Sequence, residues 1–129
     1  MSKSDQTEAL LRIMRDTTVQ MVRRDGADLS ARQLGVFLTC YTVSDPQTVR
    51  GLAALLRVSK PAITRALDRL VEFDLVRRMP DPLDRRSVLI QRTTAGQALF
   101  RDVRGYLRSA ASDETPGAAP RRAGLRASA

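Results

Sequence analysis

The sequence predicts a mostly α-helical domain with one small β-hairpin, and three observations support this fold class. Apolar residues recur at helical spacing in several segments, each preceded by a serine or threonine suited to capping a helix. Between residues 75 and 92 the pattern changes to two extended runs separated by a turn-forming segment. The chain of 129 residues is long enough for one hydrophobic core, so we expect a single domain.

The first helix is expected over about residues 4–24, where apolar side chains form a stripe with a polar back. Ser4 or Asp5 would be its N-cap, and Glu8 is placed to close a capping box. Gly26 would end it, because glycine readily adopts the positive φ that a helix terminus often needs.

A second helix is expected to begin after Ser30 and to run to about Val43. It is apolar on almost all sides, which predicts a place at the centre of the domain. This helix holds Cys40, the single cysteine. We interpret Cys40 as a buried packing residue and not as a redox sensor, because a reactive thiol needs an exposed, electropositive setting.

Two further helices are expected in close succession. Thr48 would cap a short helix over residues 49–56, and Ser59 would cap another that ends near residues 72–74. Pro61 falls in the first turn of the latter, where its missing N–H costs nothing.

The second of these helices, within "VSKPAITRALDRL" (residues 58–70), has two different faces. Ile63, Leu67 and Leu70 form an apolar face that predicts burial. The polar face carries Lys60, Thr64, Arg65 and Arg69. One face is therefore suited to a core and the other to a negatively charged partner.

Residues 75–79 and 87–92 are expected to pair as a β-hairpin, with "DPLDRRS" as its tip. Thr93 would cap the last helix, and the segment from residue 112 onward has the composition of a disordered Ala/Pro/Arg tail. Helix, helix, short helix, turn, capped helix, hairpin and helix is the order of a winged helix-turn-helix.

Charge and composition favour nucleic acid as the partner. There are 22 Lys and Arg residues against 14 Asp and Glu, a formal net charge of +8, and nearly all the cations are arginines. The arginine side chain suits phosphate and guanine recognition better than lysine does. An anionic membrane surface and an acidic protein partner are the other candidates.

Several classes of function are disfavoured. Without histidine and with one cysteine, the sequence offers no His- or Cys-based metal site, no Ser-His-Asp triad and no Cys-His dyad. No apolar run approaches a membrane span, and the N-terminal segment lacks a signal-peptide core. We therefore expect a cytoplasmic protein that is not an enzyme and that uses no cofactor, metal or membrane.

In a helix-turn-helix the second helix enters the major groove with its N-terminal residues toward the bases. We expect Arg65 to read a base, because a bidentate contact to guanine discriminates by roughly 1–3 kcal/mol. Ser59, Lys60 and Thr64 would contact phosphate, helped by the helix N-terminus that Pro61 opens. Arg69 lies one turn further along and suits either role.

The hairpin would supply a second contact. Arg85 and Arg86 lie at a tip able to reach a neighbouring minor groove, where a narrowed A·T-rich sequence attracts arginine. Asp84 is expected to orient an arginine within the protein. Arg77 and Arg78 lie on a strand, and either could contact the DNA backbone.

These residues together carry a resemblance to the MarR family of bacterial transcriptional regulators. The motifs are "SKPAITRALDRL", "LVRR", the wing "DPLDRRS" with its Asp-x-Arg, and "TTAG" at residues 93–96. The resemblance implies a homodimer on an inverted-repeat operator, with Arg86 in the minor groove. It also implies dimerisation through the first and last helices and, in many members, a pocket for a small-molecule effector, here of unknown identity.

The sequence departs from the family pattern at two positions. Asp74 stands where the family usually has glycine, and aspartate tolerates a left-handed backbone better than most residues. Arg92 stands where the family usually has an apolar residue. Members also commonly add a helix after the one that starts near Thr93, so we expect the dimer interface here to be smaller, or to be built mainly from the first helix and residues 94–110.

The expected organisation has four parts. Residues 1–28 hold the N-terminal dimerisation helix, 29–96 the DNA-binding domain, 97–111 the C-terminal dimerisation helix and 112–129 the tail. The dimerisation residues are expected to be Leu10, Ile13, Met14, Met21, Phe100, Val103 and Leu107.

The sequence thus predicts a sequence-specific regulator, most simply a repressor, that binds double-stranded DNA as a homodimer. Two alternatives remain open: a winged helix that binds a protein partner, and a non-specific DNA-binding architectural protein. Arg65 separates them, since a protein-interaction module does not need it, whereas in an architectural protein its loss weakens all DNA sequences equally.

Overall fold

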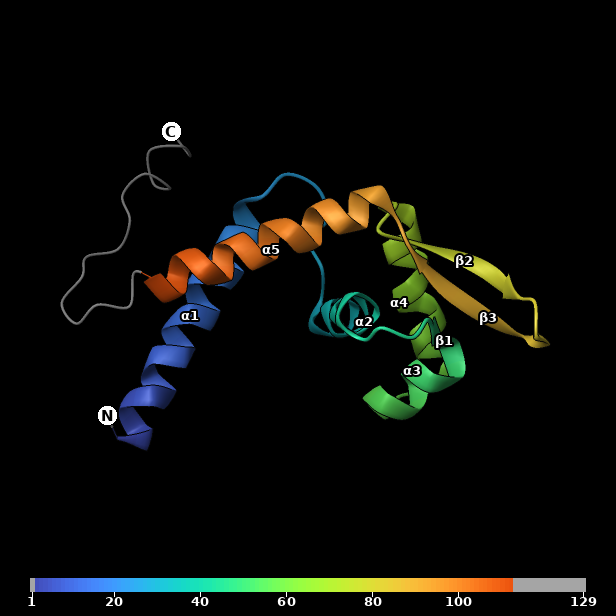
Figure 1. The fold of residues 1–129 in the computed structure, drawn as a ribbon, viewed down its shortest axis with the longest axis horizontal. Coiled ribbons are helices and arrows are strands. Elements are labelled where there is room, and N and C mark those ends of the chain that lie inside the picture. Colours follow the sequence, from blue (N-terminus) through green and yellow to red (C-terminus); the bar gives the residue numbers. More distant parts are fainter. Residues whose placement is uncertain (1, 113–129) are drawn as a thin grey trace. The chain divides into compact units, whose positions relative to one another are not determined.

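The elements follow one another in the predicted order, with one short strand added (Figure 1). The structure, a computed structural model, describes residues 2–112. Within this range the elements are α1 (Lys3–Arg23), α2 (Ala31–Thr42), β1 (Gln47–Thr48), α3 (Val49–Leu56), α4 (Lys60–Glu72), β2 (Val76–Asp81), β3 (Asp84–Arg92) and α5 (Thr94–Ser112). The predicted fold class, mostly helical with a small antiparallel sheet, is confirmed.

The described residues divide into two compact units. Residues 24–103 contain α2, α3, α4, the three strands and the first part of α5, and we call them the winged-helix unit. The other unit contains α1 and the part of α5 after Val103. The winged-helix unit therefore continues past residue 96, the boundary expected from the sequence. The predicted tail lies outside the described residues from residue 113 onward, and Ser112 still belongs to α5.

Helix α1 begins earlier than expected. The hydroxyl of Ser2 accepts a hydrogen bond from the backbone N–H of Asp5 (3.1 Å), so Ser2 takes the capping role predicted for Ser4 or Asp5. Both of those residues lie inside the helix instead. At the other end, Gly26 has φ +116°, which confirms the positive φ predicted for it.

The N-caps predicted for the next three helices are all confirmed. Ser30 accepts from the N–H of Gln33, whose side chain closes a capping box, and Thr48 accepts from the N–H of Gly51. Ser59 caps α4 in the same way. Each cap satisfies a helix N–H that otherwise has no partner inside the helix.

Helix α4 packs against α2, α3 and β2, and this contact forms the core of the winged-helix unit. The largest side chains that are entirely buried come from these elements: Val36, Phe37, Leu52, Ile63, Leu67, Leu70 and Val76. Cys40 is also buried, as predicted. Burial raises the pKa of its thiol to about 11, although the nearby Arg92 guanidinium acts in the opposite direction.

The sheet contains a strand that the sequence did not predict. The order is β1-β3-β2, with both pairs antiparallel, and the two residues of β1 pair with Leu89 and Ile90 on β3. Two residues are too few to show the alternation by which a strand is recognised. This pairing ties the chain before α3 to the base of the hairpin.

The hairpin is longer, and its turn tighter, than expected. Strands β2 and β3 extend to Asp81 and Asp84, leaving only Pro82 and Leu83 between them. The register shifts between Pro80 and Asp81, so the residues of β3 just after Asp84 bulge out of the ladder. The predicted seven-residue tip is thus a two-residue turn followed by a bulge.

A buried hydrogen-bond network joins α2, the end of α4, the end of the hairpin and the start of α5. The Tyr41 hydroxyl donates to the carbonyl of Leu75 (2.6 Å) and accepts from the backbone N–H of Thr93 (3.1 Å). The Thr93 hydroxyl donates to the carbonyl of Asp74 (2.5 Å) and accepts from the N–H of Gly96 (2.9 Å), which confirms Thr93 as the cap of α5.

Gly96 cannot be replaced without disturbing this network. A Cβ atom there would overlap the Tyr41 hydroxyl and the Leu75 carbonyl. In the "TTAG" motif, Thr93 is thus explained by its hydrogen bonds and Gly96 by the lack of space for a side chain. Asp74, where glycine is usual, adopts φ +59°, so the predicted left-handed conformation is confirmed.

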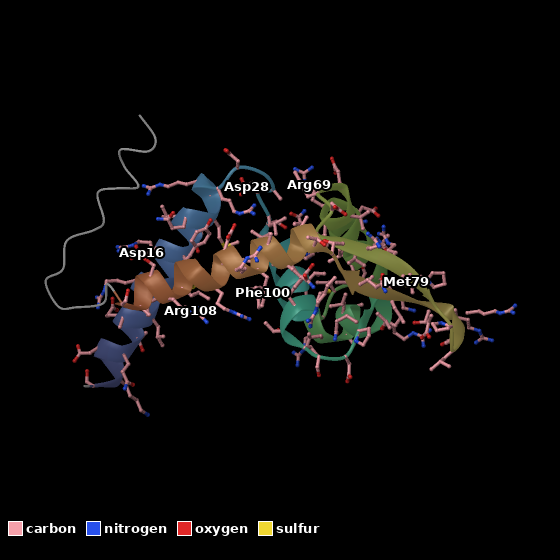
Figure 2. All side chains as sticks on the ribbon, turned by 45° about the horizontal axis from the view of Figure 1, so that its top comes forward. Asp16, Asp28, Arg69, Met79, Phe100 and Arg108 are labelled. Carbon is pink, nitrogen blue, oxygen red and sulfur yellow. The ribbon has the colours of Figure 1, made fainter. Side chains whose placement is uncertain are left out.

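Phe100 and Val103, two of the residues expected at a dimer interface, lie in the winged-helix unit. The ring of Phe100 packs against those of Phe37 and Tyr41, with centroids 6.5 and 5.7 Å apart. Figure 2 shows Phe100 on α5 beside α2. Val103 is buried within the chain, so its side chain belongs to the protein's own core.

Candidate nucleic-acid interface

Helix α4 has the two faces that the sequence predicts. Ile63, Leu67 and Leu70 are wholly buried, whereas Lys60 and Arg65 are exposed together with Thr64. Within residues 2–112, neither Lys60 nor Arg65 forms an ion pair with a carboxylate. The outward side of the N-terminal half of α4 is therefore cationic and accessible.

The first turn of α4 is built to receive an anion. The Ser59 hydroxyl oxygen accepts from the backbone N–H of Ala62 (3.2 Å), which leaves its hydroxyl proton able to donate to a phosphate oxygen. Pro61 lies in the same turn and is exposed. The positive end of the helix dipole adds to the charge of Lys60 at this point.

Arg69, the fourth cation of the predicted set, is engaged within the protein. Its guanidinium pairs with the Glu72 carboxylate (3.3 Å) and lies over the ring of Phe73, 4.4 Å from the centroid. Figure 2 labels it at the C-terminal end of α4. Arg69 thus has two local partners at the C-terminal end of α4.

Arg78 joins the hairpin to α4. Its guanidinium binds the carboxylate of Asp68 (2.5 Å) and the carbonyl of Thr64 (3.3 Å), so β2 is held against the middle of the helix. Arg78 is half-buried, whereas its neighbour Arg77 points to solvent. Of the two arginines predicted to meet the DNA backbone, Arg78 is engaged inside the protein and Arg77 is exposed.

The wing is the hairpin of β2 and β3, and carboxylates shape its tip. Asp81 accepts from the backbone N–H of Leu83 (2.9 Å), and Asp84 accepts from the backbone N–H of Arg86 (3.0 Å). Asp84 thus meets Arg86 through the main chain and not through the guanidinium. Arg85 and Arg86 are both exposed at the bulge. Figure 2 shows nitrogen-bearing side chains extending from this end of the hairpin.

The start of α2 belongs to the same surface, which the sequence analysis did not predict. Ser30, Arg32 and Gln33 line a shallow depression together with Arg65 and the small residues of α4 that face it. Arg32 is exposed and lies beside the predicted base-reading arginine. This proximity depends on the packing of α2 on α4, which no local pattern reveals.

Arg92, the second departure from the family pattern, closes the C-terminal end of α2. Its guanidinium donates to the carbonyls of Cys40 and Val43, both at 2.9 Å, and lies 5.5 Å from the centroid of the Tyr41 ring. Carbonyl groups at a helix C-terminus lack partners inside the helix, and a cation suits their negative dipole. The arginine thus provides packing and hydrogen bonds where an apolar residue would provide packing alone.

None of the helices within residues 2–112 is long and apolar enough to cross a membrane. The same residues contain no cluster of three or more His, Cys, Asp or Glu side chains arranged to hold a metal ion.

Helices α3 and α4 pack against each other, α4 exposes a cationic face, and the wing ends in arginines. This combination defines the DNA-binding domain of a winged helix-turn-helix protein. The model of the MarR family matches residues 29–88 of the chain. A relative from Mycobacterium bovis, the HTH-type transcriptional regulator Mb0904, is 31% identical over 101 residues, which are 78% of this chain and 68% of that protein. The chain belongs to the MarR family of transcriptional regulators.

Two further comparisons agree. The multiple antibiotic resistance protein MarR of Escherichia coli is 38% identical over 74 residues, covering 56% of this chain and 49% of that protein. The chain thus spans about half the length of this relative. The crystal structure of E. coli MarR in its apo form superposes with a TM-score of 0.63 and 26% identity, over 86% of this chain and 76% of that one.

Proposed function

We propose that the protein is a sequence-specific repressor that binds an inverted-repeat operator in double-stranded DNA as a homodimer. One observation carries the proposal: the exposed cationic half of α4 and the arginine-tipped wing are joined through Arg78 and Asp68. A surface with two linked cationic elements of this kind fits a major groove and an adjacent minor groove.

Arg65 is the proposed base reader on α4. It is exposed, and it lies on the helix half whose N-terminus would point toward the bases. Lys60, Thr64 and Ser59 would bind phosphate and fix the helix in register. Arg32, on the neighbouring helix α2, adds a further phosphate contact that the sequence alone did not suggest.

The wing would place Arg86 in the minor groove, with Arg85 on the adjoining phosphates. Because Asp84 binds the backbone N–H of Arg86, it fixes the main chain from which this arginine projects. The negative charge of Asp84 is thereby directed to the backbone of the bulge, and the two guanidinium groups remain available to DNA.

Exposed apolar side chains on α1 support the homodimer. Leu10 and Met14 are 65% and 67% exposed, and Val22 is 65% exposed. On α5, Leu107 is 43% exposed. A helix that leaves such a stripe uncovered gains from a second copy that buries it, and two-fold symmetry would place the half-sites about one helical turn apart. Ile13 and Met21 are half-buried beside them.

Repression would follow from occlusion of a promoter in bacterial cytoplasm, and an effector of small size would relieve it. The operator-binding activity is what the structure supports best, and it can be tested directly.

The test is selection of a random duplex library by the purified protein at near-physiological salt. The same selection is run with Arg65→Ala and with Arg108→Ala, an exposed arginine on α5 outside the winged-helix unit, so that both variants lose one positive charge. We expect the wild type and Arg108→Ala to enrich the same inverted repeat, and Arg65→Ala to lose preference at one position of each half-site.

The other outcomes separate the alternatives. If Arg65→Ala weakens binding to every duplex by the same factor, the protein is a non-specific architectural protein. If the folded wild type enriches no duplex at all, a winged helix that binds a protein partner becomes the better interpretation.

A further inference from the structure

We propose that Leu83, at the tip of the wing, enters the minor groove beside the wing arginines and acts as an apolar wedge between two stacked base pairs. The inference rests on the DNA-binding function proposed above and adds to it a residue that deforms the DNA. Among the large apolar side chains of the described residues, Leu83 is the most exposed, at 94%.

A leucine at this position does not serve the fold. Turns of two residues favour glycine, asparagine, aspartate or serine, because these adopt the required backbone angles or bond to it. Leu83 contributes to the turn through its backbone, because its N–H donates a hydrogen bond to the Asp81 carboxylate. Since the side chain is almost as exposed as in an unfolded chain, it adds almost nothing to the free energy of folding.

The tip is nevertheless held in a defined shape. Asp81 fixes the turn on the β2 side, and Asp84 fixes the bulge on the β3 side by accepting the N–H of Arg86. Pro82 restricts the backbone immediately before Leu83. The backbone of a braced turn has little conformational freedom left to lose when a partner buries its side chain.

The surroundings of Leu83 indicate what that partner is. Arg85 and Arg86 are exposed a few residues away, and both nearby carboxylates accept backbone N–H groups of the tip. A single apolar side chain flanked by cations matches a minor groove, which combines negative potential with apolar sugar edges. Proteins that bind there insert leucine, among other apolar residues, between base steps and unstack them.

The cost of unstacking depends on the sequence. Pyrimidine–purine steps such as TA and CA are the easiest to open. We therefore expect the operator to carry such a step where the tip of each wing meets it, outside the positions that α4 reads. Specificity there would arise from deformability and not from a hydrogen bond to a base.

The experiment uses the full chain and the duplex that the selection recovers. 2-Aminopurine, which pairs with thymine, replaces each adenine of the flanking segments in turn on either strand, because its fluorescence rises when the base is unstacked. We expect the wild type to raise the signal at one step on each side. Leu83→Ala should abolish the rise and weaken binding by roughly tenfold, while its unfolding curve stays that of the wild type.

Two further variants make the result decisive. Leu83→Met keeps an apolar side chain of similar volume and should retain both the signal and the affinity. Leu83→Lys adds a charge, and we expect it to bind more weakly than the wild type and to give no signal. Equal affinity and equal signal for wild type and Leu83→Ala would overturn the inference alone, as would tighter binding by Leu83→Lys. Failure of the wild type to bind any duplex would overturn the proposed function, and the wedge with it.

Discussion

The hydroxyl of Tyr41 should be worth more to the stability of the protein than any single surface contact. Replacing Tyr41 with phenylalanine removes one oxygen atom and leaves the ring in place. The hydroxyl donates to the carbonyl of Leu75 and accepts from the N–H of Thr93, and all three residues are buried. Without it, two buried backbone groups lose a partner.

The magnitude follows from those two groups. A buried donor or acceptor left unsatisfied costs about 1–3 kcal/mol. Loss of a partner for both the Leu75 carbonyl and the Thr93 N–H should lower the free energy of unfolding by about 2–4 kcal/mol. This range is below the full sum because the structure around the lost hydroxyl can relax. For a unit of this size the melting temperature should fall by roughly 4–8 °C per kcal/mol.

Urea unfolding followed by circular dichroism measures the loss. The curves are recorded at several protein concentrations, because a dimer's stability depends on concentration. The matched control is Tyr106→Phe, which removes the hydroxyl of the only other tyrosine. A Tyr41→Phe protein within about 0.5 kcal/mol of the wild type would refute the network as a source of stability.

Three further outcomes are expected. Gly96→Ala should lower the free energy of unfolding by about 3 kcal/mol or more, because its Cβ would overlap the Tyr41 hydroxyl; thermal unfolding would show this, and an unchanged melting temperature would contradict it. Arg78→Met should weaken operator binding severalfold while the salt dependence stays that of the wild type, and adding Asp68→Asn should cause little further loss; a salt slope lower by about one would instead make Arg78 a phosphate contact. Cys40 should resist alkylation at about pH 8 in the folded protein and react after unfolding, since its thiol is buried and its raised pKa keeps it protonated; rapid modification of the native protein would argue against this.

The raised pKa of Cys40 also makes the free energy of unfolding depend on pH in the alkaline range. Because the thiol titrates near 11 in the folded chain and near 9.0 otherwise, its contribution is fully present below pH 9.0 and is lost as the pH rises toward 11. In the unfolded chain the proton is released first, so alkali favours unfolding. Near neutral pH the thiol is protonated in both the folded and the unfolded chain, so its titration does not change the stability there.

Local features were predicted well because their causes lie within a few residues of each other. The caps Ser30, Thr48 and Ser59 each act on an N–H three residues later, and the positive φ of Gly26 and Asp74 depends on the residue itself. Where the local signal was ambiguous, as at the start of α1, the prediction was wrong by two residues or more.

The candidate interface was predicted in part, for a related reason. The exposure of Lys60 and Arg65 follows from the helical period, because the opposite face holds Ile63 and Leu67. The period cannot show which exposed cation has a partner. Arg69 contacts Glu72, on its own helix, and Phe73, directly after it. Whether its guanidinium binds these neighbours or points to solvent depends on side-chain geometry.

The sequence by itself therefore determined the order of the helices, the two faces of α4 and the arginine-rich wing. Their causes are helical and strand periodicity, capping chemistry and charge, which act over short stretches of chain. The tertiary structure alone decided that Tyr41 meets Thr93, that Arg78 meets Asp68 and that Arg32 lies beside Arg65. These contacts join residues on different elements, and only the packing of those elements brings them within hydrogen-bonding or contact distance.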